Sequence, residues 1–315
     1  MKKIPLVIDV DTGTDDSIAI TAALLCKDAL DIKAFTTVMG NVSIDKTSRN
    51  TLNLVDYLGH DSKVAVGAAK PLVKEFTQAI SHGSTGLGDV VLPESKRSFY
   101  AKDAADTIYE EAVKANGELQ LLAVGPLTNL AESIKRYPDI ISKLKKITIM
   151  GGGVFGGNMT MTSEFNIYND PEAAKIVFEA GIPLTMVGLD VTLKTTLPPE
   201  LLTAVKKVDS RYAIFAAKIF DFMFRRKVEI GGDDPHLHDV IALASIIKPE
   251  IVTYKDFYMT VECEGTITRG MTIADLNNVE GKLPTVRAAL GIDSNAFWQW
   301  LQALLISSNK SNKGV

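Results

Sequence analysis

The chain has 315 residues, of which 46% are hydrophobic and 23% are charged, and its net charge is −4. This is the composition of an ordinary globular protein with enough apolar residues for a sizeable core. The sequence holds no block of five or six basic residues and no apolar stretch long enough to cross a bilayer. We therefore expect neither a nucleic-acid partner nor a membrane partner.

The first part of the chain alternates strand-like and helix-like segments. Short apolar runs predict strands at 4–8, 32–38, 64–66, 119–123, 147–150 and 184–187. Helical patterns lie between them at 17–26, 44–58, 102–115, 127–136 and 171–180. Ser43 and the pair Asp170-Pro171 are residue types that begin helices. Strands that alternate with helices of this length indicate βαβ units and a parallel sheet.

The pattern changes after about residue 190. Helices are predicted first, at 199–208, 211–226 and 238–247. Three short strands follow, with a turn at Glu264-Gly265, and they are predicted at 252–254, 257–263 and 266–268. A final helix contains Trp298 and Trp300 and ends near Ile306, and the polar tail 307–315 is expected to be disordered.

We see no internal repeat and no linker rich in proline, glycine or serine, which favours a single domain over 1–315. The predicted fold is α/β: an open, mostly parallel central sheet flanked by helices, with a Rossmann-like core. A mainly helical carboxyl-terminal layer and a small hairpin complete it. Cys26 and Cys263 lie in apolar segments, which favours two buried thiols over a disulfide. The amino-terminal apolar run ends at Asp9, too early for a signal peptide, so we expect a cytoplasmic protein.

Four acids lie within eight residues near the amino terminus: Asp9, Asp11, Asp15 and Asp16. They fall between the first predicted strand and the first predicted helix, and in a parallel sheet this turn lies at the edge where ligands bind. Like charges at this density repel one another, and their burial is costly without a partner. Helix capping and a turn at 12–13 would account for two of the acids. A hard divalent cation, which prefers oxygen ligands, would account for all four.

Further polar clusters follow the ends of later predicted strands. They lie at 39–41, 125–129, 151–153, 156–158, 164–166 and 236–239. Taken singly, each asparagine is a common turn residue, the glycine run lacks dinucleotide-binding spacing, and Asp239 could cap a helix. Taken together, the amides and carboxylates converge on one edge of the sheet. Such a set suits a ligand with many hydroxyls, such as a sugar.

Several motifs occur in a fixed order along the chain. They are Asp9-Val10-Asp11-Thr12-Gly13-Thr14-Asp15-Asp16, Gly40-Asn41, Gly125-Pro126-Leu127-Thr128-Asn129, Met150-Gly151-Gly152, Asn158, Glu164-Phe165-Asn166, Asp170-Pro171-Glu172-Ala173-Ala174 and His238-Asp239. As a set they resemble the nucleoside hydrolases of the inosine-uridine-preferring type, from about residue 4 to at least residue 245. Thr12 is a departure, because the family more often has proline there, and both residues fit a turn.

The resemblance implies an open α/β fold and hydrolysis of the N-glycosidic bond of ribonucleosides by a Ca²⁺-bound water. It implies that Asp11, Asp16 and Asp239 are carboxylate ligands of the Ca²⁺ and that Thr128 adds its backbone carbonyl, which makes an all-oxygen set. Asp11 would also act as general base. Asp9, two residues away on the same strand, would support these ligands.

The resemblance also assigns residues to the ribose and the base. The ribose would be held by Asp15, Asn41, Asn158, Glu164 and Asn166. His238 is placed to protonate the leaving base, a task for a group that titrates near neutrality. His82, in the glycine-rich stretch 81–89, would contact the base from a mobile lid. His236 has no family match and is interpreted as a loop residue. The family has base-contacting residues shortly before the His-Asp pair, which here is the stretch 220–227, without a residue-by-residue match. Its aromatic residues could stack on a base or fill the core, and the core is favoured.

The implied partner is a small-molecule ribonucleoside, with a broad preference for inosine and pyrimidine nucleosides. The implied assembly is a homotetramer or a homodimer. Both statements rest on the resemblance alone.

Two other functions are considered. Asp9-x-Asp11-Thr12 after a strand also fits the nucleophile-and-acid motif of haloacid-dehalogenase-type Mg²⁺ phosphohydrolases, which act through an aspartyl-phosphate. The later Mg²⁺ acids would then be Asp233, Asp234 and Asp239. That hypothesis leaves the cluster at 164–166 unexplained. A non-catalytic nucleoside-binding protein is the other alternative, and the pair at 238–239 together with the full acid set argues against it.

Overall fold

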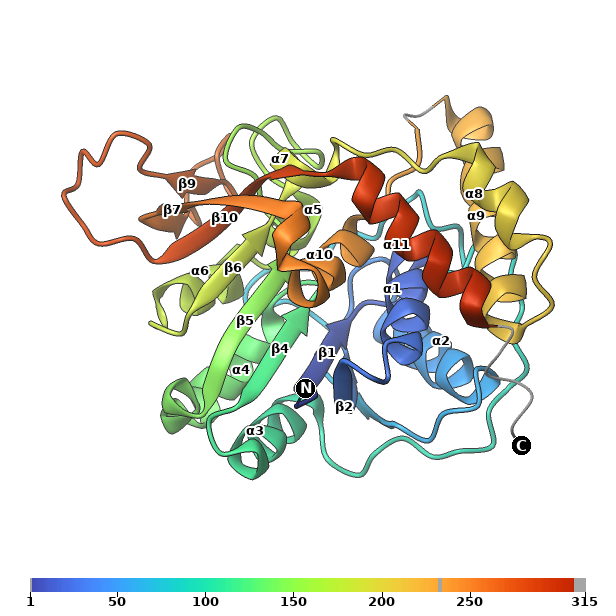
Figure 1. Cartoon of the computed structure of the whole chain (residues 1–315). Helices are drawn as coiled ribbons and strands as arrows, with labels where there is room; N and C mark the ends of the chain where they lie inside the picture. The colour runs from blue at the N-terminus through green and yellow to red at the C-terminus, as the bar shows by residue number, and fades with distance from the viewer. Residues whose placement is uncertain (1, 232–233, 309–315) are drawn as a thin grey trace.

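The computed structural model describes residues 2–231 and 234–308 (Figure 1). Its centre is a sheet built from β1 (Ile4–Val10), β2 (Leu30–Thr37), β3 (Lys63–Val66), β4 (Leu119–Ala123), β5 (Leu144–Met150), β6 (Leu184–Val187), β7 (Val252–Phe257) and β10 (Val286–Ile292). The strand order is β3-β2-β1-β4-β5-β6-β10-β7. Neighbouring strands are parallel, except that β7 runs antiparallel to β10. The predicted open, mostly parallel sheet is confirmed.

The position of β1 in this order decides where a ligand can bind. The chain leaves β1 for β2 on one side, and the sheet later continues from β4 on the other side. In open α/β sheets, ligands bind at the carboxyl ends of the strands at such a reversal of strand order. The acid motif 9–16 begins in β1 and continues into the turn that follows it.

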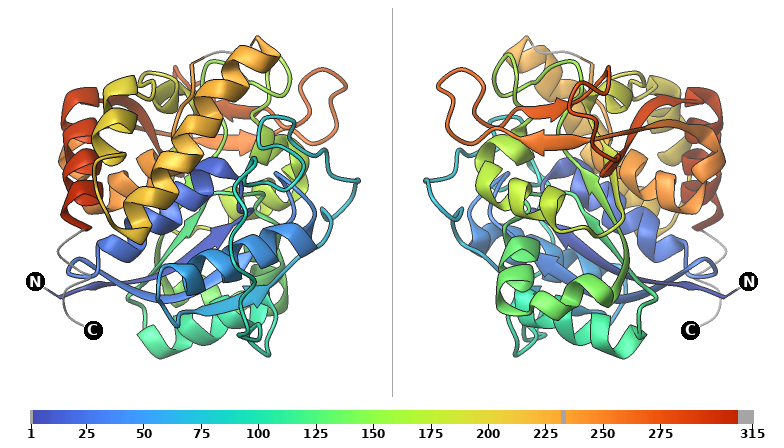
Figure 2. Two further views of the ribbon diagram at one scale, coloured as in Figure 1. Left: turned by 90° about the vertical axis from the view of Figure 1, so that its right-hand side faces the viewer. Right: turned by 90° about the vertical axis from the view of Figure 1, so that its left-hand side faces the viewer.

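Helices cover both faces of the sheet (Figure 2). One face packs against α1 (Thr14–Leu25), α2 (Ile44–Tyr57), α8 (Pro199–Val205), α9 (Arg211–Ile230), α10 (His238–Ile247) and α11 (Ser294–Ser307). The other packs against α3 (Ala104–Ala115), α4 (Thr128–Arg136) and α6 (Pro171–Glu179). Along β1, Leu6 and Ile8 enter the first core and Val7 enters the second, as the alternation of side chains along a buried strand requires.

The carboxyl-terminal layer differs from the prediction in two strands. The hairpin is confirmed, but β8 (Met259–Val261) pairs with β9 (Thr272–Ala274). The strand predicted at 266–268 is wrong, because this segment forms a turn in which the Arg269 amide donates to the Gly265 carbonyl at 3.0 Å. β10 was not predicted. Its sequence, Val-Arg-Ala-Ala-Leu-Gly-Ile, contains alanines and a glycine, which are rare in strands, so pairing with β6 and β7 determines its conformation.

The end of the described chain is ordered. α11 runs through Ser307, and Ser308 is buried with its hydroxyl 2.5 Å from that of Ser210. These two residues are therefore ordered, contrary to the prediction of a disordered tail, whose remainder, 309–315, lies outside the described residues. Cys26 and Cys263 are free thiols, the first buried and the second half-buried. Within the described ranges, no helix is both long and apolar enough to cross a membrane.

Candidate active site

The acid motif is held by the turn between β1 and α1. Gly13 is the residue before α1, and Asp16 lies in the first turn of that helix. One carboxylate oxygen of Asp16 accepts the Gly13 amide at 2.9 Å, and the other accepts the Asp11 amide at 3.1 Å. A carboxylate that accepts amides at a helix start is held firmly by its own backbone. Asp16 is therefore fixed in place before any ligand binds.

Asp11 lies at the bottom of a narrow space between glycines. Its Oδ2 accepts the Asn41 amide at 2.7 Å. Its Oδ1 is buried and has no hydrogen-bond partner among the described residues. A side chain at Gly40 would place Cβ 2.1 Å from Oδ2, and one at Gly125 would place it 2.9 Å from Oδ1. The two glycines therefore leave room for this carboxylate, because a side chain at either position would collide with it.

Three carboxylates form a group that could hold a metal ion. Ligand atoms of Asp15, Asp16 and Asp239 all lie within 4.8 Å of one another, and all three residues are buried. Burial, and then the charge of Asp15, raises the pKa of Asp16 to about 7. Burial and the neighbouring acids likewise hold the pKa of Asp239 and of Asp11 well above the usual range. Such a set fits a hard divalent cation, which would supply the missing positive charge.

A cavity of about 560 Å³ opens beside these acids. Six of the predicted acids and amides line it: Asp15, Asn41, Asn158, Glu164, Asn166 and Asp239. The predicted histidines, His82 and His238, also line it. The structure thus brings together residues that are more than 200 positions apart in the sequence.

Asp9 lies behind the cavity rather than in its wall. Its Oδ1 accepts the Thr36 hydroxyl at 2.5 Å and the Asn129 side-chain amide at 2.7 Å. Its Oδ2 is buried without a partner among the described residues, and burial raises its pKa to about 7. A group in this position can support the ligands in front of it without contacting a substrate.

The structure does not place Thr128 with the other predicted ligands. Thr128 begins α4, its hydroxyl donates to Asp170 at 2.6 Å, and it is not one of the cavity residues. As the first residue of a helix, it directs its carbonyl along the helix toward the amide four residues on. Val124, just beyond β4, does line the cavity, and its carbonyl accepts the Asn166 side-chain amide at 2.8 Å. A hydrogen bond made by the backbone of an apolar residue leaves no signal in the sequence.

Glu164 is the most firmly held of the ribose-side residues. It caps α5 (Phe165–Asn169), and its carboxylate accepts the amides of Gly152 at 2.9 Å, Asn166 at 3.0 Å and Ile167 at 3.2 Å. Burial nevertheless raises its pKa to about 7. Nearby, the Asn158 side-chain oxygen accepts the Phe165 amide at 3.0 Å. The backbone therefore fixes the directions in which these side chains face the cavity.

The predicted histidines line the cavity close to the acids, and the charge of Asp15 acts on both of them. His82 Nδ1 accepts the Thr14 amide at 3.0 Å, so the glycine-rich stretch is anchored to the start of α1. His238 Nδ1 lies 2.8 Å from the Thr192 hydroxyl, and burial lowers the pKa of His238 to about 4. His236 belongs to the loop before α10, as predicted, but it also lines the cavity, with its ring 5.5 Å from that of His238.

The end of α9 contributes cavity residues from the region near 220–230, where the sequence alone allowed no assignment residue by residue. Met223, Arg226, Lys227 and Ile230 line the cavity, whereas Phe220 is fully buried in the core, as interpreted from the sequence. Helical spacing of Met and Ile between charged residues is common on any amphipathic helix, so only the tertiary position of α9 shows that these side chains face the cavity.

The fold and the site define an α/β protein with an oxygen-lined, metal-capable site at the edge where strand order reverses. The sequence profile of the inosine-uridine preferring nucleoside hydrolases matches residues 6–299. The chain belongs to this family. That membership favours neither the phosphohydrolase nor the binding-protein alternative. Of the three acids that the phosphohydrolase hypothesis needs, Asp233 lies outside the described residues and Asp234 pairs with Lys227.

Relatives in this family are similar over nearly their whole length. The chain is 36% identical to the non-specific ribonucleoside hydrolase RihC of Escherichia coli, over 96% of this chain and 98% of that one. Among solved structures, it resembles a purine-preferring ribonucleoside hydrolase from Gardnerella vaginalis, with a TM-score of 0.91, 33% identity and coverage of 98% and 99%. It also resembles an inosine-guanosine nucleoside hydrolase, with a TM-score of 0.88, 29% identity and coverage of 96% and 98%.

Proposed function

We propose that this chain hydrolyses the N-glycosidic bond of ribonucleosides to ribose and free base, with Ca²⁺ as its cofactor. The observation that carries the proposal is the buried carboxylate group at the end of β1, which faces a cavity lined by amides and further carboxylates. Family membership supports the reaction. The all-oxygen character of the group supports a hard cation.

Asp16 and Asp239, two members of the group of three buried carboxylates, would hold the metal together with Asp11, whose Oδ1 has no partner among the described residues. Asp15, the third member of that group, is assigned to the ribose. We assign the carbonyl ligand to Val124 instead of Thr128, because Val124 lines the cavity and Thr128 begins a helix. Bound Ca²⁺ would supply Lewis acidity that lowers the pKa of a water, and would offset the charge of the acids. Asp11 is the best placed general base, since its Oδ1 is buried and has no partner among the described residues.

The ribose would be bound by the oxygen-rich part of the cavity wall. We assign the sugar hydroxyls to five side chains: Asp15, Asn41, Asn158, Glu164 and Asn166. Cleavage of the glycosidic bond develops positive charge on the ribose, as in other glycoside hydrolysis. Carboxylates and amide oxygens already fixed around it stabilise that charge without reorganisation.

The leaving base would lie near the histidines. Because Nδ1 of His238 is engaged with Thr192, its Nε2 is the nitrogen available to donate a proton to the base. A base that takes on negative charge as it departs favours the protonated form of a neighbouring histidine. His82 would contact the base from the segment anchored at α1. We propose a broad preference for inosine and pyrimidine nucleosides.

The test is release of reducing sugar from inosine, uridine, cytidine and adenosine, by protein with one equivalent of Ca²⁺ and by protein treated with a chelator. We expect turnover that chelation removes and Ca²⁺ restores, with about one bound Ca²⁺ per chain by elemental analysis. Full activity in metal-free protein would contradict the metal proposal. Activity on phosphate esters with none on nucleosides would contradict the reaction.

Two proposals concern the protein as a whole. We propose a cytoplasmic location, which two free thiols support. We also propose a homotetramer or homodimer, and light scattering after gel filtration would measure its mass.

A further inference from the structure

The short helix α7 (Leu189–Thr192) contacts the proposed site from both of its ends. At its start, the Leu189 amide donates to the Gly152 carbonyl at 2.9 Å. The next residue, Asp190, accepts the amides of Val154 and Phe155. At its end, the Thr192 hydroxyl lies 2.8 Å from Nδ1 of His238. No residue of α7 lines the cavity itself.

The loop that α7 contacts follows β5 and reaches Glu164. Its four successive amides, 152 to 155, all donate to side chains from other segments. Gly152 donates to Glu164 at 2.9 Å, and Gly153 donates to Thr272 at 3.0 Å. Val154 and Phe155 donate to the two oxygens of Asp190 at 2.7 and 3.1 Å. The orientation of the Glu164 carboxylate therefore depends on a backbone that Asp190 and Thr272 fix.

Close packing leaves this backbone little freedom. Gly152 has φ +73°, and a Cβ there would lie 2.9 Å from the Thr272 side chain. Gly188, the residue before α7, would place a Cβ 2.5 Å from the Gly152 carbonyl oxygen. Glycine is required where two backbones approach so closely. The loop and α7 therefore form one unit, and a displacement of α7 would displace the Gly152 amide, one of the three that hold Glu164.

The other end of α7 fixes the histidine. Thr192 is fully buried, so its hydroxyl has a defined position. A hydroxyl can donate to a neutral Nδ1 and accept from a protonated one. Thr192 can therefore hold the His238 ring in the same orientation before and after proton transfer, with Nε2 left for the substrate.

We propose that α7 positions both halves of the active site, with Asp190 acting on the ribose side through Glu164 and Thr192 acting on the leaving-group side through His238. Both are positioning residues and contact no substrate. The inference rests on the proposed function, because it assigns the two sides of the cavity to the sugar and the base. It predicts that variants at the two ends of one four-residue helix differ in their substrate dependence.

The experiment compares inosine, whose base leaves poorly without a proton, with p-nitrophenyl riboside, whose leaving group needs none. Thr192→Val should lower kcat on inosine by about 10- to 100-fold, the usual cost of losing a partner that orients a functional side chain. It should change kcat on the nitrophenyl riboside by less than about twofold, because proton donation is not used there. Thr192→Ser, which keeps the hydroxyl, should restore the rate on inosine.

Asp190→Asn should lower kcat/KM on both substrates by a similar factor, because both carry the same ribose. Thr272→Val, which removes the neighbouring bond to the same loop, should give the same pattern if Asp190→Asn folds poorly. Asp275→Asn is a matched control. Its carboxylate also accepts two successive amides, those of Val279 and Glu280 at 2.8 Å each, in a loop that does not line the cavity. It should retain wild-type rates on both substrates.

Several results would overturn the inference. Equal losses on the two substrates in Thr192→Val, or no recovery in Thr192→Ser, would exclude the assignment of Thr192. Wild-type kcat/KM in both Asp190→Asn and Thr272→Val would exclude the loop assignment. If the wild-type protein releases ribose from neither substrate, the proposed function fails, and this inference fails with it. If the wild type is active, Thr192→Val keeps its ratio of the two rates, and Asp190→Asn and Thr272→Val keep its kcat/KM, this inference alone fails.

Discussion

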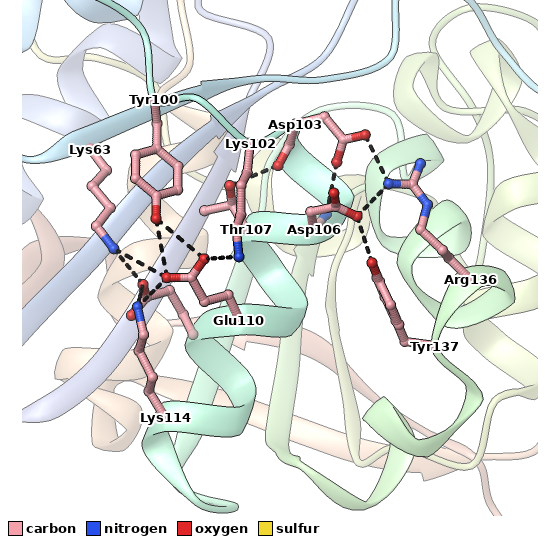
Figure 3. Close-up of polar contacts among 11 residues, drawn as sticks. Lys63, Tyr100, Lys102, Asp103, Asp106, Thr107, Glu110, Lys114, Arg136 and Tyr137 are labelled. Carbon is pink, nitrogen blue, oxygen red and sulfur yellow. Dashed lines mark hydrogen bonds and ion pairs between the residues drawn. The ribbon is translucent and has the colours of Figure 1, made fainter.

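The acid-rich stretches at 9–16 and at 103–111 differ in what surrounds their carboxylates. The first has four acids in eight residues, and the second has four in nine, counting Asp103, Asp106, Glu110 and Glu111. The first set is buried at the carboxyl end of β1, where the nearest charges are other acids. The second set lies on and before α3, among lysines and an arginine (Figure 3).

The two environments shift the pKa of a carboxyl in opposite directions. Hydrogen bonds from Lys102, at 2.6 Å, and from Lys114 lower the pKa of Glu110 to about 2. Burial raises the pKa of Asp16 to about 7. Acid density alone therefore does not identify a site. A buried acid cluster that the protein's own cations leave uncompensated does, because its energetic cost requires a ligand or a function.

The largest expected effect is the difference in kcat between a variant of the first stretch and a variant of the second. Asp11→Asn should lower kcat on inosine by about 10⁴-fold or more, because it removes both the proposed base and a metal ligand. Glu110→Gln, the same chemical change in the compensated stretch, should leave the rate unchanged. Reducing-sugar release measures both variants. Wild-type turnover in Asp11→Asn would show that the uncompensated cluster is not catalytic.

The second prediction concerns the sugar hydroxyls that the buried acids and amides would bind. The rate on 2′-deoxyuridine should be lower than that on uridine by ~10⁴-fold, as for other pockets built to bind a hydroxyl. The missing hydroxyl leaves Glu164 and the asparagines around it without the additional partner that the ribose would supply inside the cavity. Competition between the two nucleosides in one assay measures the ratio. Equal rates would contradict the assignment of this wall to ribose.

The third prediction concerns His238, which lines the cavity. His238→Ala should lower kcat on inosine by about 10²–10⁴-fold if His238 is the general acid. Hydrolysis of p-nitrophenyl riboside should change little, because nitrophenolate departs without a proton. Equal losses on both substrates would mean that His238 positions the site and does not donate the proton.

The sequence predicted those parts of the site that act through polar side chains near strand ends. Residues such as Asp11 and Asn41 follow closely after strands β1 and β2, and parallel strands bring their carboxyl ends to one edge. The sequence could not indicate Val124, an apolar residue that lines the cavity and whose carbonyl accepts the Asn166 side-chain amide. Nor could it show which residues near 220–230 form the wall at α9, since that depends on how a helix packs across the sheet.

The strands, too, could be predicted from the sequence only in part. Strongly apolar strands such as β1 were predicted, whereas β10, with two alanines and a glycine, forms only because its neighbours pair with it. The hairpin was predicted but its second strand was misplaced by several residues, because turn and strand propensities are similar over 264–274. Pairing with strands that are distant in the sequence determines the conformation of such segments, and the local sequence pattern does not contain that information.

The fourth prediction compares a buried acid of the cavity wall, Glu164, with Glu110 of the compensated stretch by the pH dependence of stability. Glu164 has a folded pKa of about 7, above its ordinary value, so the folded protein binds more protons there than the unfolded chain. Its contribution to stability is therefore greatest below about pH 4.5 and falls as pH rises to 7. The wild type should lose on the order of 1–3 kcal/mol relative to Glu164→Gln across this range. Denaturant unfolding of chelated proteins measures the difference.

Glu110 should show the opposite sign. Its folded pKa of about 2 lies below the ordinary value, so its stabilising contribution is present above pH 4.5 and is lost as pH falls toward 2. The stability of the wild type relative to Glu110→Gln should therefore decrease only on the acid side. If both glutamates changed stability in the same direction with pH, the contrast between the buried acids of the cavity and the compensated acids of 103–111 would be wrong.

The smallest expected effect is the stability of Glu110→Gln at neutral pH. The cations around Glu110 are half-exposed, with Lys102 at 51% and Lys114 at 53% side-chain exposure. Ion pairs of this kind contribute only about 0.2–1 kcal/mol each, and salt screens them. We therefore expect a loss of about 1 kcal/mol or less in the free energy of unfolding. In 1 M salt the loss should shrink further. A larger loss that persists in high salt would mean that the network on α3 supports the fold by buried hydrogen bonding and not by screened surface ion pairs.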